Sequence, residues 1–185
     1  MQVKKNEKRI KIIESAIELF GRENFEDVTT EMIANEAHVG KGTLYIYFKN
    51  KDYMIGEVLL YVLEEFLKAT EKVKACEGDL DQKIEKLFEL YQNVAKTRRN
   101  LLPFFMRIYA DEKINNRRNQ IQLKMRNHLI DIFKEFEDQL SSPLDVAVDF
   151  IIVNTMPFSM KRFAENPEYW DCVVKIIKKG IKKFP

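Results

Sequence analysis

Apolar residues recur along most of the chain at intervals of three and four, the spacing of one face of an α-helix. The first such stripe predicts a helix from about Lys5 to Glu23, which Asn24 can close in a left-handed conformation. A long helix is expected from about Asn50 to Cys76, followed by a break at Glu77-Gly78-Asp79. Between these two helices the pattern changes to shorter segments.

These short segments have the outline of a helix-turn-helix. Val28-Thr29-Thr30 supplies an N-cap for a short helix that ends near Ala37. After a three-residue break at His38-Val39-Gly40, a second short helix is expected over 41–48.

The second half of the chain continues the helical pattern. Further helices are expected over about 80–94, from Pro103 onward, and over about 121–140, 143–164 and 167–183. Pro157 lies inside the penultimate helix and should kink it. The chain is therefore predicted to be all-α, with about nine helices and no convincing strand.

Composition supports the all-α class and indicates the cellular compartment. Six Gly and five Pro among 185 residues are too few for an all-β fold. The two cysteines, Cys76 and Cys172, suggest reduced thiols rather than a disulfide framework or a metal site. Without a signal peptide or an apolar run of the roughly 20 residues that a membrane span needs, we expect a cytoplasmic protein with no membrane partner.

The formal net charge of +2 hides local basic segments. Residues 38–51 contain three lysines and no acid, and residues 4–11 carry five basic residues against Glu7. Such segments suit the phosphates of a nucleic acid, and a lysine-rich N-terminal arm can add contacts that weaken with salt.

The expected helix over 41–48 sorts its side chains by direction. At about 100° per residue, Leu44 and Phe48 share an inward face. Tyr45, Ile46 and Tyr47 point elsewhere, on a face without an acid. This face is either a solvated surface with chance tyrosines or a surface that approaches DNA.

The complete string decides between these alternatives. Thr29-Thr30-Glu31-Met32-Ile33-Ala34, followed by the run from Ala37 to Lys51, resembles the TetR family of bacterial transcriptional regulators. The resemblance covers about the first 55 residues. It implies a three-helix DNA-binding domain over 1–51, joined by a long fourth helix to an effector-binding and dimerisation domain over 52–185. It also implies a homodimeric, ligand-responsive repressor whose partners are palindromic operator DNA and a small effector.

The resemblance also assigns roles to single residues. Lys41, Gly42 and Tyr45 fall where the family reads base edges, and Thr30, Thr43, Tyr47 and Lys51 fall where it holds phosphates. His38 stands where the turn usually has Gly, and we expect it to tolerate a positive φ. Gly40 replaces a common Ser or Thr cap, which removes one hydroxyl.

In the C-terminal region the resemblance implies an effector cavity and a four-helix dimer interface. The expected pocket residues are Phe88, Tyr91, Phe104, Tyr109, Met125, His128, Phe150 and Asn154. The expected interface residues are Phe150, Val153, Trp170, Val173, Val174 and Ile177. Their apolar stripes could also be intramolecular core. A large apolar effector is favoured. An acidic effector remains an alternative, because the region also contains Arg98, Arg99, Arg107 and Arg162.

Two other functions remain as alternatives to a repressor. The same fold could act as a transcriptional activator or adaptor. An all-helical enzyme is a distant third, because common catalytic motifs are absent and the histidines are only His38 and His128. We predict no catalytic residue, no cofactor and no metal.

Overall fold

The computed structural model describes residues 2–23, 26–98, 101, 112–154 and 167–183. Within these ranges the chain forms eight α-helices and one 3-10 helix. The predicted all-α class is confirmed. The helix expected from Pro103 onward, the cap at Asn24 and the kink at Pro157 lie outside the described residues.

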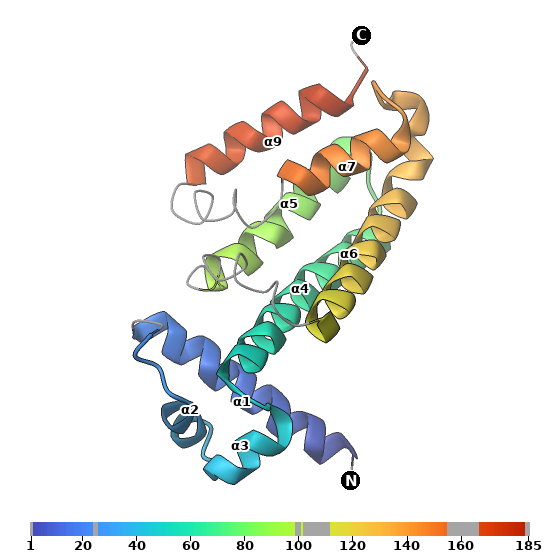
Figure 1. Ribbon diagram of the computed structural model, residues 1–185. Coiled ribbons are helices and arrows are strands. Elements are labelled where there is room, and N and C mark those ends of the chain that lie inside the picture. The colour runs from blue at the N-terminus through green and yellow to red at the C-terminus, as the bar shows by residue number, and fades with distance from the viewer. Residues whose placement is uncertain (1, 24–25, 99–100, 102–111, 155–166, 184–185) are drawn as a thin grey trace.

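The first three helices pack together at one end of the molecule (Figure 1). They are α1 (Gln2–Arg22), α2 (Thr30–Glu36) and α3 (Lys41–Tyr47). Ile13 and Phe20 of α1, Ile33 of α2 and Leu44 of α3 are buried in the hydrophobic core. Since α1 begins at Gln2, the basic residues near the N-terminus belong to a helix and not to an arm.

Helix α4 (Lys51–Ala75) leads from this three-helix group into the rest of the molecule (Figure 1). Asn50 caps it, because its Oδ1 accepts a hydrogen bond from the Tyr53 amide at 2.7 Å. Helix α5 (Leu80–Thr97) starts with a reciprocal capping box between Asp79 and Gln82. The break predicted between these helices is therefore present.

Helix α6 (Glu112–Phe133) lies along α4 and continues into a 3-10 helix over Lys134–Gln139 (Figure 1). The predicted α-helix up to Leu140 was thus too long at its end, where Phe136 has a non-helical φ of −113°. Helix α7 (Leu144–Asn154) contacts α6, and α9 (Pro167–Ile181) contacts α5. Two main-chain hydrogen bonds join the segment at the end of the 3-10 helix to the end of α9. The Ser141 amide donates to Ile181 O at 2.8 Å, and the Lys183 amide donates to Gln139 O at 2.9 Å.

Two groups of ion pairs tie α1 to the helices beyond it. Glu57 on α4, only 3% exposed, binds Arg9 of α1 and Arg117 of α6. Glu14 of α1 accepts from the Tyr61 hydroxyl at 2.6 Å and from Arg98 at 3.2 Å. Burial, and then this hydrogen bond to Glu14, raise the pKa of Tyr61 to about 12. The orientation of α1 therefore depends on charged side chains of α4, α5 and α6.

Candidate nucleic-acid interface

The turn between α2 and α3 is a complete Schellman motif. The Val39 amide donates to Ala34 O at 2.9 Å, and the His38 amide donates to Asn35 O at 3.0 Å. His38 occupies the left-handed position, with φ 52°. The expectation that His38 can replace glycine in this turn is confirmed. Thr29 caps α2 by accepting from the Met32 amide at 3.1 Å, which sets the start of the motif.

Helix α3 divides into a buried and an exposed face, as its sequence predicts. Leu44 and Phe48 are fully buried against the core of the three-helix group. Lys41, Gly42, Tyr45 and Ile46 are exposed. A methyl group at Gly42 would meet nothing within 4 Å, so the main chain of α3 is open to close approach there.

Two of the expected base-reading residues are bound to α2. Tyr45 Oη lies 3.2 Å from Thr30 Oγ1. Lys41 Nζ donates to Glu31 Oε2 at 3.2 Å. Sequence reasoning did not anticipate the contact of Glu31 with this surface. Both partners of the Lys41–Glu31 pair are more than half exposed, so the pair contributes little to stability and opens at little cost.

The expected phosphate contacts flank this face. Thr43 and Tyr47 lie one helical turn apart on α3 and are half-buried. Lys51 is the first residue of α4, where main-chain amides also favour an anion. Next to it, Lys49 Nζ lies 4.9 Å from the centroid of the Tyr53 ring.

The basic segment near the N-terminus contributes less than its charge suggests. Lys8 and Lys11 are exposed on α1. Arg9 points inward and forms an ion pair with Glu57, so its charge is neutralised within the protein. The side chains of Lys4 and Lys5 lie outside the described part of the chain.

The expected effector residues occupy different surroundings. Phe88 and Tyr91 of α5 are buried, and the Tyr91 ring meets Phe66 edge-on at 5.2 Å. Burial raises the pKa of Tyr91, whose hydroxyl has no hydrogen-bond partner among the described residues. His128 Nδ1 lies 3.1 Å from the buried Thr70 hydroxyl. Met125 packs half-buried against the core.

The remaining expected effector residues are less informative. The Asn154 amide donates to Phe150 O at 2.8 Å within its own helix. Phe150 itself is partly exposed. Phe104 and Tyr109 lie outside the described residues.

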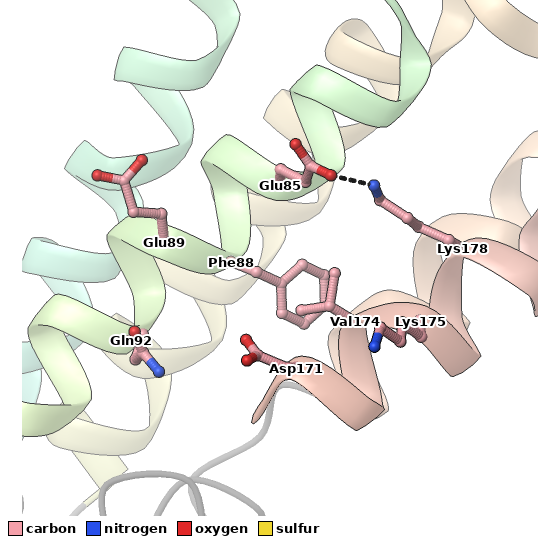
Figure 2. A pocket seen from close by; sticks show the side chains of 8 residues that line it. All are labelled: Glu85, Phe88, Glu89, Gln92, Asp171, Val174, Lys175 and Lys178. Carbon is pink, nitrogen blue, oxygen red and sulfur yellow. Dashed lines mark hydrogen bonds and ion pairs between the residues drawn. The ribbon is translucent and has the colours of Figure 1, made fainter. Parts of the chain in front are cut away.

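A pocket of about 470 Å³ lies between α5 and α9 (Figure 2). Phe88 and Val174 are its apolar side chains, and the Glu85–Lys178 ion pair crosses one end. The other lining residues are Glu89, Gln92, Asp171 and Lys175. Phe88 is the one expected effector residue on its wall, so this pocket differs from the expected cavity.

The expected interface residues on α7 and α9 differ in exposure. Phe150 and Val153 are exposed, Val173 and Val174 are half-buried, and Ile177 is buried. The side chain of Trp170 lies outside the described residues. Val146 and Ile176, which were not among the expected residues, are also exposed on these helices.

Metal sites and membrane-spanning helices are both absent from the described residues. No group of three or more His, Cys, Asp or Glu side chains could hold a metal ion there. In the same ranges, no helix has the length and apolarity to cross a membrane.

Comparison with known proteins identifies the helix-turn-helix. Residues 12–58 match the sequence family described as "Bacterial regulatory proteins, tetR family". The HTH-type transcriptional regulator YhgD of Bacillus subtilis is 31% identical over 93 residues, 50% of this chain and 44% of that protein. The match identifies residues 12–58 as a helix-turn-helix segment of the TetR family.

Similarity to the curated relatives is confined to part of each protein. The fatty acid metabolism regulator protein of B. subtilis is 30% identical over 79 residues, 43% of this chain and 38% of the relative. The chain thus spans less than half the length of these two relatives.

Solved structures extend the likeness in fold to the whole chain. A putative TetR regulator from Shewanella matches with a TM-score of 0.68 and 22% identity, over 96% of this chain and 99% of that one. FadR from B. subtilis, solved with stearoyl-CoA, matches with a TM-score of 0.71 and 18% identity, over 93% and 98%. The helices outside residues 12–58 therefore follow the TetR architecture.

Proposed function

We propose that this protein is a dimeric TetR-family repressor that binds a palindromic operator in the cytoplasm and is released by a small effector. The proposal rests on the exposed face of α3, where Lys41 and Tyr45 lie beside the open main chain of Gly42. It assigns residues 1–51 to DNA binding and residues 52–185 to effector binding and dimerisation.

The exposed face has the chemistry of a groove-binding helix. An α-helix fits the major groove, and a residue without a side chain near its start allows the backbone to approach the bases. Lys41 and Tyr45 can exchange their contacts with Glu31 and Thr30 for base edges. The hydroxyls of Thr30, Thr43 and Tyr47 and the ammonium of Lys51 are suited to phosphates on either side.

Selection of bound sequences from random duplex DNA tests this proposal. We expect an inverted repeat whose half-sites lie about 34–36 Å apart, one helical turn. Tyr47→Ala and Lys51→Ala should weaken binding to every sequence, and Lys51→Ala should lower the salt dependence by about one ion per subunit. Lys124→Ala, on the exposed surface of α6, is the control. Unchanged, salt-independent binding by the first two variants would overturn the mapping.

The proposed dimer uses α7 and α9. Phe150 is 39% exposed, Val153 67% and Ile176 57%, and a cluster of exposed apolar side chains on neighbouring helices is typical of an interface. Val153→Glu and Ile176→Glu should yield monomers in sedimentation equilibrium. Leu123→Glu, an equally apolar exposed site on α6, should leave the dimer intact.

The proposed effector is an apolar molecule, with a long-chain acyl group as the first class to test. Phe88 and Tyr91 offer buried apolar surface on α5, and the Tyr91 hydroxyl could donate to an effector carbonyl. The FadR complex with stearoyl-CoA supplies the probe. Stearoyl-CoA should release the selected DNA, whereas free coenzyme A should not, and the DNA should weaken stearoyl-CoA binding by the same factor. DNA binding without this response would reject the acyl class alone.

A further inference from the structure

Ile46 occupies the centre of the exposed face of α3. At about 100° per residue, the buried Leu44 and Phe48 lie about 40° apart, and Ile46 points directly away from the midpoint between them. Its side chain is 70% exposed, more than that of any other large apolar residue in the described part of the chain. Nothing in the packing of the three-helix group accounts for an isoleucine at this position.

The neighbours of Ile46 leave it projecting. Gly42, one turn earlier on the same face, has no side chain to cover it. On one side, Tyr45 and Lys41 are drawn toward α2 by Thr30 and Glu31. On the other side, Thr43 and Tyr47 are half-buried. Any surface that meets the exposed face of α3 therefore meets the Ile46 side chain at its centre.

We infer that Ile46 is a sequence-reading residue that contacts the C5 methyl group of a thymine in each operator half-site. This inference rests on the proposed function, because it requires α3 to enter the major groove. Among the four bases, only thymine presents a methyl group there, and apolar side chains recognise it by contact. Isoleucine cannot form a side-chain hydrogen bond, so burial of this methyl is the means by which it can distinguish one base from another.

Deoxyuridine tests the inference, because it differs from thymidine by this methyl group alone. In the selected operator, each symmetric pair of thymines is replaced by deoxyuridine, and affinities are measured for the wild type and for Ile46→Ala. At one of these thymine pairs, the replacement should weaken wild-type binding by about fourfold per half-site, the equivalent of roughly 0.8 kcal/mol for one buried methyl group. Ile46→Ala should bind the two duplexes alike, and Ile46→Val should retain part of the discrimination.

Leu123→Ala is the matched control, because it also removes an exposed apolar side chain and lies on α6. It should respond to deoxyuridine as the wild type does. Since Ile46 is exposed, unfolding measurements should show that Ile46→Ala is as stable as the wild type. Equal sensitivity of wild type and Ile46→Ala at every thymine pair would overturn the inference. If no DNA sequence is selected at all, the proposed function itself is wrong. If a sequence is selected but Ile46→Ala is as sensitive to deoxyuridine as the wild type, only the role of Ile46 is wrong.

Discussion

The carboxylate of Glu57 on α4 binds the guanidinium of Arg117 on α6. The same carboxylate binds Arg9 on α1, so one buried anion joins the three-helix group to the beginning of α6. Both arginines are partly exposed, whereas Glu57 is not. The two cations therefore stabilise a charge that has little access to water.

Removing both arginines should cost more than the sum of the single changes. Arg9→Met and Arg117→Met each leave Glu57 one cation, and we expect each to lower the free energy of unfolding by about 1 kcal/mol. The double variant leaves the carboxylate buried and unpaired, so a further loss of about 1–3 kcal/mol is expected. Urea unfolding at one fixed protein concentration measures this cycle.

The exposed Arg126–Asp149 pair supplies the comparison for that cycle. Arg126→Met should cost less than about 1 kcal/mol, because surface pairs are weak. Additive effects of the Arg9 and Arg117 changes would contradict the role given to Glu57.

At Gly56, α4 lies directly against the Ile114 side chain of α6. A methyl group there would lie 2.9–3.1 Å from three side-chain carbons of Ile114. Alanine normally stabilises a helix interior by about 1 kcal/mol relative to glycine, but here we expect Gly56→Ala to destabilise by about 1–3 kcal/mol through overpacking. Ile114→Ala combined with Gly56→Ala should recover part of this loss in urea unfolding. If Gly56→Ala is instead more stable than the wild type, α6 can move away from α4 without a loss of stability.

The buried Tyr91 and the half-buried Tyr61 should respond in opposite directions to loss of the hydroxyl. Tyr91→Phe removes a buried hydroxyl that has no partner in the described part of the chain, so we expect up to about 1 kcal/mol of added stability. Tyr61→Phe breaks the hydrogen bond to Glu14 and should cost about 1 kcal/mol. Because the pKa of Tyr61 is raised to about 12, its contribution is complete below pH 10 and is lost as pH rises through 12. Urea unfolding at neutral pH separates the two variants; a loss in Tyr91→Phe would reveal a partner for that hydroxyl.

Gly42→Ala should separate stability from DNA binding. The added methyl group meets no protein atom within 4 Å, so the fold should keep its stability or gain a few tenths of a kcal/mol. On DNA the methyl group would stand between the main chain of α3 and the base edges, and we expect at least about a tenfold loss of affinity. Thermal unfolding and fluorescence anisotropy with the selected operator measure the two effects. Undiminished affinity would show that α3 does not approach the groove at Gly42.

Acid should weaken the attachment of α9 to α5. The Lys182 ammonium, 2.7 Å from Asp81 Oδ2, and the nearby Lys178 hold the pKa of Asp81 below its ordinary value of 3.8. A lowered pKa means that the contribution of Asp81 is complete above about pH 4 and is lost as pH falls through the folded value. Asp81→Asn should therefore reduce stability at pH 7 and flatten its fall below pH 4. Asp138→Asn, at an exposed position, should leave that fall unchanged.

Local pattern was sufficient for most of the helices. The N-cap at Thr29, the break at Glu77-Gly78-Asp79 and the apolar stripes place α1 to α5 close to their observed ends. The inward direction of Leu44 and Phe48 followed from helical periodicity alone. Such features depend on neighbours within one or two turns, which sequence displays directly. The 3-10 end after Phe133 was missed, because it arises where the chain turns to meet the end of α9.

By itself, the sequence determined the helix-turn-helix and which face of its second helix is exposed. Tertiary structure alone decided which charges remain available on that face. Glu31 binds Lys41 from a separate helix, and Arg9 is turned inward by a carboxylate 48 residues away. Pairs of this kind depend on how helices pack in three dimensions, whereas periodicity records only which face of a helix is apolar.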